Sequence, residues 1–271
     1  MILASFAGAI VMAALELPLA WKWQLGMRRV GLALGLIVVA AGALGLAAGE
    51  ALGLSTGIRA LVGGALTFVG SFGVLAYRFY RDPDRAPPAG DHVVVSPADG
   101  EIVYVRRSSD GRLPVACKRG HDVALEELTR TKVHDGESIV VGIGMSFLDV
   151  HVNRAPIAGR VQLRRHFPGQ FGSLRHAEMV FENERATTLI AGREFEVAVV
   201  QIASRLVRQI AAYVREGDDV LLGQRIGVIR LGSQVDLVLP SRPGLRLCVQ
   251  AGDHVQAGTT VVATIGVEET G

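Results

Sequence analysis

The sequence predicts a mainly β soluble domain, of the barrel or sandwich-hybrid type with one or two short helices, that follows N-terminal transmembrane α-helices. Residues 1–77 contain only six charged side chains, although 20% of the whole chain is charged. The remaining chain consists largely of short β-branched segments separated by Gly, Pro or Asp, a pattern typical of strands and turns. Hydrophobic residues make up 49% of the chain, which excludes a disordered or collagen-like protein. We therefore expect a membrane anchor over residues 1–77.

The anchor contains two charge-free runs, Val30–Gly49 and Ala60–Tyr77. About 20 apolar residues in a helix span the roughly 30 Å of hydrocarbon in a bilayer, so both runs are predicted to cross the membrane. Met1–Leu15 is also apolar, but it lacks the basic start of a secretion signal, and Glu16 and Pro18 interrupt the apolar run. This first segment is therefore predicted to be a third, weaker span or a helix at the membrane surface.

Basic residues flank the two strong spans unequally. Only Arg59 lies between the spans, whereas three basic residues precede the first span and three follow the second: Lys22, Arg28, Arg29, Arg78, Arg81 and Arg85. Because segments rich in Lys and Arg remain on the cytoplasmic side, we expect a bacterial-type inner-membrane protein whose soluble domain faces the cytoplasm.

Residues 78–91 are expected to form an extended linker between the anchor and the soluble domain. Asp82-Pro83 and Pro87-Pro88 lie in this segment, and proline both stops a helix and favours extended backbone in the residue before it. The soluble domain is therefore expected to occupy residues 92–271.

Eight segments of the soluble domain have the composition of strands: His92–Ser96, Glu101–Val105, Ile139–Ile143, Arg160–Leu163, Glu194–Ile202, Ile226–Leu231, Val235–Leu239 and Val261–Ile265. Two other segments favour helices. Ser204–Arg215 has apolar residues at helical spacing, and Ala124–Thr131 is expected to form a short helix within a polar excursion over residues 106–137.

Two pairs of similar phrases indicate an internal repeat. Gly217–Gly223 (GDDVLLG) is echoed by Gly252–Gly258 (GDHVQAG), and each has the Gly and Asp of a tight turn between strands. Ser96–Val103 and Ala155–Val161 share the pattern Pro-x-x-Gly-x-Ile/Val. Such repeats are typical of the flattened barrels that carry biotin or lipoate. A carrier needs a lysine on an exposed hairpin, and no lysine lies within or between the two turn phrases, which argues against that function.

The soluble domain lacks the patterns of several common enzyme classes. It has no H-E-x-x-H, no G-x-S-x-G, no phosphate loop ending in Gly-Lys-Ser/Thr and no G-x-G-x-x-G. Cys117 and Cys248 are far apart and form no C-x-x-C motif, so neither a disulfide framework nor a zinc site is predicted, and we expect no metal. Acidic and basic residues are balanced after the anchor, which argues against nucleic acid as a partner.

Four polar residues between the predicted strands remain as candidates for chemistry: Asp99, Asp149, His151 and Ser233, the last directly after Gly232. Each also has a structural interpretation. The two aspartates could cap turns, the histidine could be a satisfied core imidazole, and Gly232-Ser233 could be a bulge. Together they supply an acid, an imidazole and a hydroxyl, which are the groups that activate serine toward a carbonyl.

Six phrases span nearly the whole soluble domain: Arg78–Arg85 (RFYRDPDR), Ser96–Gly100 (SPADG), Met145–Pro156 (MSFLDVHVNRAP), His166–Phe171 (HFPGQF), Glu182–Arg185 (ENER) and Arg230–Asp236 (RLGSQVD). In this order they resemble the proenzymes of the short type of phosphatidylserine decarboxylase. The resemblance implies self-cleavage between Gly232 and Ser233. A β chain of residues 1–232 and an α chain of residues 233–271 would result, and they would remain associated.

The residues at this junction suit such a cleavage on chemical grounds. Glycine offers an unhindered carbonyl, which the Ser233 hydroxyl can attack to shift the acyl group from nitrogen to oxygen. β-Elimination of the ester leaves dehydroalanine, which tautomerises and hydrolyses to a pyruvoyl group and ammonia. Threonine would leave a different keto group, so serine is the residue that this product requires.

The resemblance further implies that the pyruvoyl group made from Ser233 is the cofactor. Its carbonyl would form a Schiff base with the serine amine of phosphatidylserine in the membrane and act as an electron sink when carbon dioxide leaves, giving phosphatidylethanolamine. Homo-oligomer formation is compatible with the sequence. No headgroup-binding residue is assigned, because a solvated face explains each nearby arginine equally well: Arg154, Arg164, Arg165, Arg205 and Arg208.

In this family reading Asp99 orients a histidine that deprotonates the Ser233 hydroxyl. His151 is the best candidate for that base and for protonating the carbanion after decarboxylation; Asp149 is a second-rank acid. Some relatives carry two histidines three apart in this loop, whereas this chain has His151 and then Arg154. Either one imidazole serves both steps or the base differs.

Three rival functions remain at the level of the sequence. A membrane-tethered β-barrel adaptor without catalytic activity would stay uncut and would be indifferent to Ser233→Ala. A pyruvoyl decarboxylase of a soluble amino acid would cut itself but would not need the apolar N-terminal segment. An inactive relative would keep the fold without processing.

Overall fold

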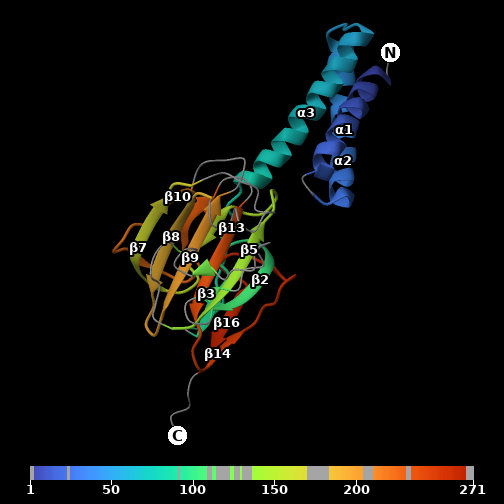
Figure 1. Cartoon of the computed structure of the whole chain (residues 1–271). Coiled ribbons are helices and arrows are strands. Elements are labelled where there is room, and N and C mark those ends of the chain that lie inside the picture. Colours follow the sequence, from blue (N-terminus) through green and yellow to red (C-terminus); the bar gives the residue numbers. More distant parts are fainter. Residues whose placement is uncertain are drawn as a thin grey trace. The chain divides into compact units, whose positions relative to one another are not determined.

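A computed structural model of the whole chain has two compact units, Met1–Arg81 and Asp82–Gly271 (Figure 1). The structure describes residues 3–22, 25–90, 92–108, 112–113, 123–124, 129, 136–169, 183–203, 210–229 and 233–266.

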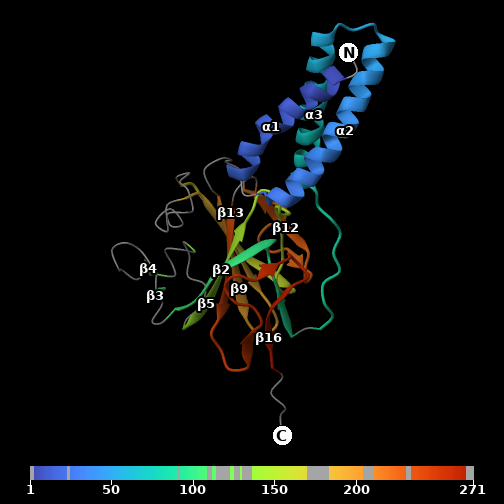
Figure 2. The ribbon, with the colours of Figure 1, turned by 90° about the vertical axis from the view of Figure 1, so that its right-hand side faces the viewer.

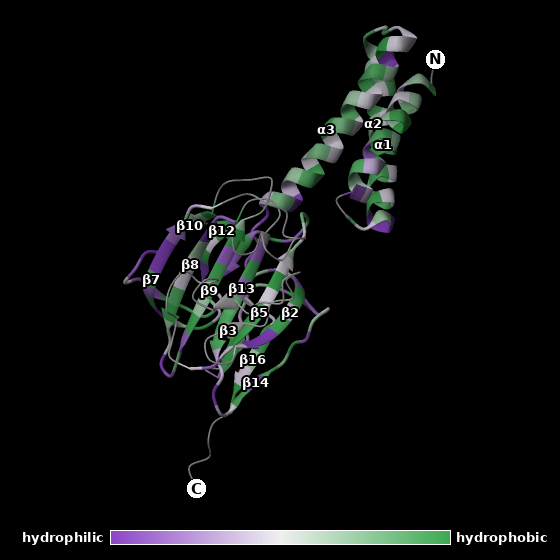
Figure 3. Cartoon of the chain, in the orientation of Figure 1, coloured by the Kyte–Doolittle hydropathy of each residue, from purple (hydrophilic) through white to green (hydrophobic). Residues whose placement is uncertain are grey.

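The first unit consists of three helices, α1 (Leu3–Lys22), α2 (Met27–Ala51) and α3 (Thr56–Tyr80). All three are long and apolar enough to cross a membrane, and Figure 3 shows hydrophobic residues along each of them. The two strong predicted spans lie within α2 and α3. Helix α1 runs through Glu16 and Pro18, so the first helix extends beyond the predicted apolar segment Met1–Leu15.

Glycines allow close packing of the first and third helices. A Cβ at Gly8 would meet the carbonyl oxygen of Ala60, and a Cβ at Gly63 would meet the carbonyl oxygen of Ser5. Between α2 and α3 the buried Arg59 side chain donates to the carbonyl oxygen of Gly49 at 2.8 Å and pairs with Glu50. Small residues therefore set the distance between these helices, as is common in membrane proteins.

The second unit begins with an extended segment. Residues 81–90 contain neither helix nor strand, and this segment runs along the β domain in Figure 2. The first three residues of the predicted linker, Arg78–Tyr80, instead form the last turn of α3. Proline at 83, 87 and 88 accounts for the extended backbone, because it cannot donate a helical hydrogen bond.

The rest of the second unit is built from antiparallel strands, which confirms the predicted mainly β domain. The largest sheet has the order β11-β7-β8-β9-β13-β5-β2-β15, with β11 Asp219–Val220, β7 Gly159–Phe167, β8 Arg185–Ala191, β9 Glu196–Ala203, β13 Ser233–Pro240, β5 Ser138–Met145, β2 Gly100–Ser108 and β15 His254–Val255. Figure 1 shows its central strands side by side.

Smaller sheets complete the domain. One has the order β1-β16-β14 and another β10-β12-β6, with β1 Val93–Val95, β16 Val261–Ile265, β14 Leu245–Leu247, β10 Ile210–Ala212, β12 Arg225–Ile229 and β6 Val152–Arg154. A two-stranded pair joins β3 (Arg112–Leu113) to β4 (Val123–Ala124). Residues from the large sheet and both three-stranded sheets form one core, including Ile143, Leu237, Ile226 and Val262.

The predicted internal repeat is confirmed by equivalent main-chain hydrogen bonds. In the first copy, Gly258 N donates to Ser96 O at 2.8 Å; in the second, Gly223 N donates to Ala155 O at 2.9 Å. The copies also cross each other reciprocally. Val95 N donates to Pro156 O, and Arg154 N donates to Pro97 O, both at 2.9 Å.

The shared glycine of the pattern Pro-x-x-Gly-x-Ile/Val has the same steric reason in both copies. A Cβ at Gly100 would meet the carbonyl oxygen of Gly144, and a Cβ at Gly159 would meet that of Ala191. The turn glycines Gly223 and Gly258 have φ values of 72° and 76°, which favour glycine. The repeat is therefore a property of the backbone as well as of the sequence.

Some predicted elements differ from the structure. Ser204–Arg215 is not a helix where it is described: Ile210–Ala212 forms β10 and pairs with β12, while residues 204–209 lie outside the described residues. The apolar spacing there serves strand pairing and core packing instead. Of the short helix expected over Ala124–Thr131, Thr129 is helical and Ala124 belongs to β4; the other residues lie outside the described residues, as does Cys117. Cys248 is a free and exposed thiol.

Candidate active site

Ser233 is the first residue of β13, which lies in the middle of the large sheet. Its main chain is paired with Met145 of β5 on one side and with Ala203 of β9 on the other. Gly232 lies outside the described residues, so the structure describes the chain on the C-terminal side of the predicted cleavage point. That side is held by strand pairing from its first residue.

His151 comes from the segment that connects β5 to β6. This segment starts directly after Met145, the strand partner of Ser233, and the His151 side chain is buried, with 2% of the residue exposed. Ile229 N donates to His151 O at 3.1 Å. Ile229 precedes Ser233 by four residues in the chain, so both ends of this segment are tied to the neighbourhood of the predicted junction.

Asp149 caps a turn, which is the structural interpretation that the sequence left open. Its carboxylate accepts a hydrogen bond from the Ser146 main-chain N at 2.7 Å, which is a turn cap of the kind that aspartate commonly forms. The contact explains this residue without assigning it chemistry.

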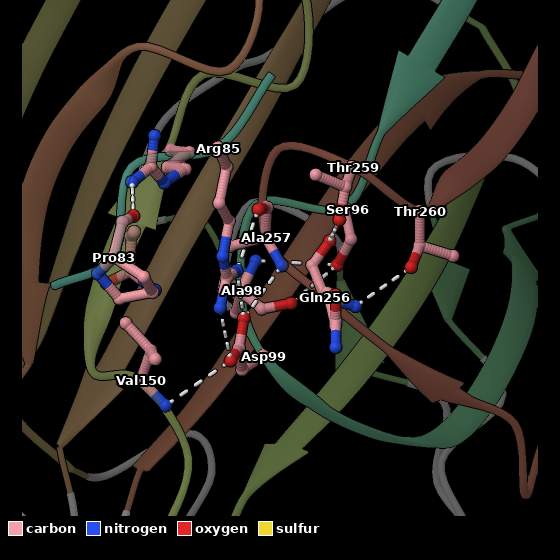
Figure 4. A network of polar contacts seen from close by, with 12 residues as sticks. Pro83, Arg85, Ser96, Ala98, Asp99, Val150, Gln256, Ala257, Thr259 and Thr260 are labelled. Carbon is pink, nitrogen blue, oxygen red and sulfur yellow. Dashed lines mark hydrogen bonds and ion pairs between the residues drawn. The ribbon is translucent and has the colours of Figure 1, made fainter. Parts of the chain in front are cut away.

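Asp99 lies in the turn between β1 and β2 and is buried, with 6% of the residue exposed. Figure 4 shows that main-chain and side-chain donors converge on it. The Arg85 guanidinium contacts both carboxylate oxygens, at 2.5 and 2.8 Å. Ala257 N donates to Oδ1 at 2.8 Å, and Val150 N donates to Oδ2 at 3.4 Å. Val150 directly precedes His151 in the chain. The structure therefore places the predicted acid, Asp99, against the main chain next to the predicted base.

The ion pair with Asp99 also affects the arginine. A hydrogen bond to Asp99 is the largest influence on Arg85 and raises the pKa of its guanidinium above the usual value. Both side chains are about nine-tenths buried. A bidentate pair of this kind is strong and directional, so Asp99 is held in one orientation.

One acid–base pair was missed by the sequence reasoning. His166 Nε2 lies 2.6 Å from Glu184 Oε1, and the Glu184 carbonyl accepts a hydrogen bond from Ala203 N at 2.9 Å. Ala203 is the strand partner of Ser233, so Glu184 lies in the same row of the sheet, about 10 Å from Ser233 at two strand spacings. Both residues lie in phrases that carry the family resemblance, but no local pattern in the sequence indicates their pairing.

A second buried carboxyl follows Ser233 in the same strand. Asp236 accepts hydrogen bonds from Tyr104 Oη at 2.8 Å and from Gln234 Nε2 at 2.7 Å. Burial raises the pKa of Asp236 to about 6, and burial together with the nearby carboxylate raises the pKa of Tyr104 well above its usual value. Tyr104 is 132 residues from Asp236 in the sequence, so only the fold reveals this cluster.

The arginines near the predicted site differ in their accessibility. Arg154 is buried and donates to the carbonyl oxygens of Gly223 and Pro83 at 3.0 and 2.9 Å, so it is engaged in holding the chain. Arg164 is partly buried, and burial lowers its pKa. Arg205 and Arg208 lie outside the described residues. Among the residues that the structure describes, no group of three or more His, Cys, Asp or Glu could hold a metal ion.

The chain is similar to known proteins over most of its soluble part. The family model described as phosphatidylserine decarboxylase matches residues 72–263. A phosphatidylserine decarboxylase proenzyme of Pelobacter propionicus is 37% identical over 189 residues, which are 69% of this chain and 76% of the relative. Another from Geobacter metallireducens is 34% identical over 199 residues, 73% of this chain and 81% of the relative. A protein of Methanocaldococcus jannaschii, whose name refers to archaetidylserine decarboxylation, is 38% identical over 187 residues, 68% and 87% respectively.

Proposed function

This chain belongs to the phosphatidylserine decarboxylase family and is a decarboxylase, and we propose that it cuts itself between Gly232 and Ser233 and uses the resulting pyruvoyl group to convert phosphatidylserine into phosphatidylethanolamine and carbon dioxide. The observation that carries the proposal is the position of Ser233. It begins a strand that is paired on both sides, directly after the one residue whose carbonyl its hydroxyl would attack.

The contacts of Asp99 support the roles proposed for it and for His151. The Asp99 carboxylate is fixed by Arg85 and two main-chain donors, and it lies beside the turn that carries His151. In the proposal Asp99 orients the imidazole. His151 takes the proton from the Ser233 hydroxyl as the oxygen attacks the Gly232 carbonyl, and it returns this proton to the nitrogen of residue 233 as the peptide C–N bond breaks. It then takes the Cα proton of residue 233 as the Cβ–O bond breaks and Gly232 leaves as a carboxylate. The resulting dehydroalanine tautomerises to an imine, which consumes water and releases ammonia.

The strand pairing supports continued association of the two products. Four strands, β13, β14, β15 and β16, belong to the proposed α chain. Strand β13 pairs with β5 and β9, β15 pairs with β2, and β16 pairs with β1, all of which belong to the proposed β chain. Cleavage of one peptide bond would leave these ladders intact, so the new N-terminus would stay in the middle of the large sheet.

The residues present suit a pyruvoyl group, because the position that would carry it is a serine directly after a glycine, and its strand partner Met145 leads into the segment that carries the buried His151. The pyruvoyl carbonyl would supply the electron sink that makes loss of carbon dioxide from the bound serine headgroup favourable. We propose that His151 also delivers the proton that replaces carbon dioxide. We further propose that the three apolar helices hold the chain in a bacterial inner membrane, with the soluble domain in the cytoplasm.

The proposal is tested with the purified full chain in vesicles of phosphatidylserine and phosphatidylcholine, by measuring phosphatidylethanolamine over time. We expect product from the wild type and none from Ser233→Ala. His151→Gln should lose processing and activity together. His166→Gln is the matched control, because it changes the imidazole that contacts Glu184. Glutamine can keep a hydrogen bond to Glu184, so this variant should still be processed.

The rival functions give other results in this experiment. An adaptor without catalytic activity, or an inactive relative, stays uncut and yields no phosphatidylethanolamine from any form of the chain. A decarboxylase of a soluble amino acid releases carbon dioxide from free serine and leaves the vesicles unchanged. Normal processing of His151→Gln combined with loss of processing in His166→Gln would move the base role to His166.

A further inference from the structure

The segment that follows the membrane helices in sequence is fastened to the β domain by three arginines. Arg225 contacts Asp82 and Asp84 at 2.6 and 2.7 Å, and Arg154 contacts Asp82 and the Pro83 carbonyl at 3.3 and 2.9 Å. The third arginine, Arg85, belongs to the segment itself. It is the only one of the three whose described contacts include Asp99.

The contacts of Arg85 join the linker to the proposed acid and to the turn that supports it. Its two terminal nitrogens contact the two Asp99 oxygens at 2.5 and 2.8 Å, and Nη1 also donates to the Ala257 carbonyl at 2.8 Å. Ala257 in turn donates its main-chain N–H to Asp99 at 2.8 Å. Figure 4 shows this closed set of contacts. A planar guanidinium fork matches a carboxylate in a way that the single ammonium of lysine cannot.

The second copy of the repeat shows that the fold of the turn does not depend on this ion pair. The position equivalent to Asp99 is Ala158, which is exposed. Gly223 N nevertheless donates to Ala155 O there, as Gly258 N donates to Ser96 O in the first copy. The same backbone therefore forms without an aspartate, and the buried pair of Arg85 and Asp99 needs a reason other than the turn.

We propose that Arg85 is a positioning residue for self-cleavage: it holds the Asp99 carboxylate beside the turn that carries His151, so that a chain matures only when its linker is docked on the β domain. The inference rests on the proposed function. Arg85 acts through Asp99 and takes no part in the bond changes. The coupling follows from covalent connection, because Arg85 reaches Asp99 only when residues 82–85 lie along the domain.

The test measures the rate at which newly made full chain is cut, by denaturing gel after cell-free synthesis with lipid vesicles. Arg85→Gln should slow cutting by about tenfold or more, since small displacements of a reacting group cost rate steeply. Arg85→Lys should recover part of the loss. Arg225→Gln is the matched control: it removes exposed linker contacts without touching Asp99, while Arg154 still holds Asp82 and Pro83, so the linker stays docked and the rate should stay within about twofold of the wild type.

A double-variant comparison separates positioning from general stability. If Arg85 acts through Asp99, adding Arg85→Gln to Asp99→Asn should slow cutting by less than about twofold, because paired residues are not additive. Folding is checked independently by thermal unfolding of the same substitutions in the uncut Ser233→Ala chain.

Three outcomes would overturn the inference: wild-type cutting by Arg85→Gln, equal slowing by Arg225→Gln, or full additivity with Asp99→Asn. A loss of folding in Arg85→Gln without any recovery in a folded Arg85→Lys would also count against it. Failure of the proposed function gives a distinct result, because the wild type itself would then remain uncut.

Discussion

The two copies of the repeat share a backbone and differ in chemistry. Both close on a turn glycine with positive φ and on the same pair of main-chain hydrogen bonds. In one copy the turn carries Asp99, buried and bound by Arg85, Ala257 N and Val150 N. In the other, the equivalent position is an exposed Ala158.

This difference separates what the fold needs from what the reaction needs. Equivalent glycines, Gly100 and Gly159, allow the same close approach to a neighbouring carbonyl, so both copies obey one steric rule. The turn does not require Asp99, because the equivalent turn of the other copy forms with Ala158 at that position. A buried carboxylate is costly unless it is paired, and here a second residue from the linker supplies the pairing.

The largest expected effect comes from exchanging the one position at which the copies differ. Asp99→Asn should slow self-cleavage by about 100-fold or more, because the imidazole loses its orienting charge. Ala158→Asp, in the other copy, should leave the rate within about twofold. Both rates can be measured on a denaturing gel. Comparable slowing by the two substitutions would show that Asp99 serves the turn and not the reaction.

A smaller effect is expected from Asp236, the other buried carboxyl. Its hydrogen-bond partners, Tyr104 and Gln234, are neutral, whereas Asp99 is paired with the cation of Arg85. The pKa of Asp236 is raised from 3.8 to about 6, so the folded chain binds more protons than the unfolded chain between these values. The free energy of unfolding should therefore fall as pH rises through this window, by up to about 3 kcal/mol.

Asp236→Asn should remove that pH dependence. The measurement is denaturant unfolding of the Ser233→Ala chain, with and without Asp236→Asn, at pH 4.5 and 7.5. Asp218→Asn serves as control because Asp218 is exposed. An unchanged pH dependence in the Asp236 variant would mean that this carboxyl ionises in the folded chain as it does in the unfolded one.

The smallest effect concerns a feature that the two copies share. Asp218 accepts from Arg215 N, and Asp253 accepts from Gln250 N, each at 2.8 Å. Asp218→Ala and Asp253→Ala should each lower the free energy of unfolding of the Ser233→Ala chain by about 1 kcal/mol, equal within a few tenths. A difference above about 1 kcal/mol would break the equivalence of the two turns.

Local sequence features predicted much of the fold. Strands with β-branched residues, such as Val235–Leu239 and Val261–Ile265, were found where expected, because their composition suits a buried pleated surface. Strand β8 was missed, since Arg185, Thr187 and Thr188 are polar yet buried. The apolar spacing around Ile210 favoured a helix, but pairing with β12 prevailed there.

Less of the site could be predicted, because its contacts join distant parts of the chain. Asp99 and His151 were singled out from short phrases and family resemblance, and their roles stay predictions. Arg85 meets Ala257 across 172 residues, and His166 meets Glu184 through adjacent strands. Neither contact follows from spacing along the sequence, since each depends on strand order and on how the linker lies.

The central claim is that this polypeptide breaks its own main chain before residue 233. Intact-mass measurement of the purified, active protein tests it most directly. We predict two fragments, residues 1–232 and residues 233–271, the second blocked to N-terminal sequencing and lighter by one ammonia than a fragment that begins with serine. A single 28.8 kDa chain that decarboxylates phosphatidylserine with an unmodified Ser233 would contradict the account.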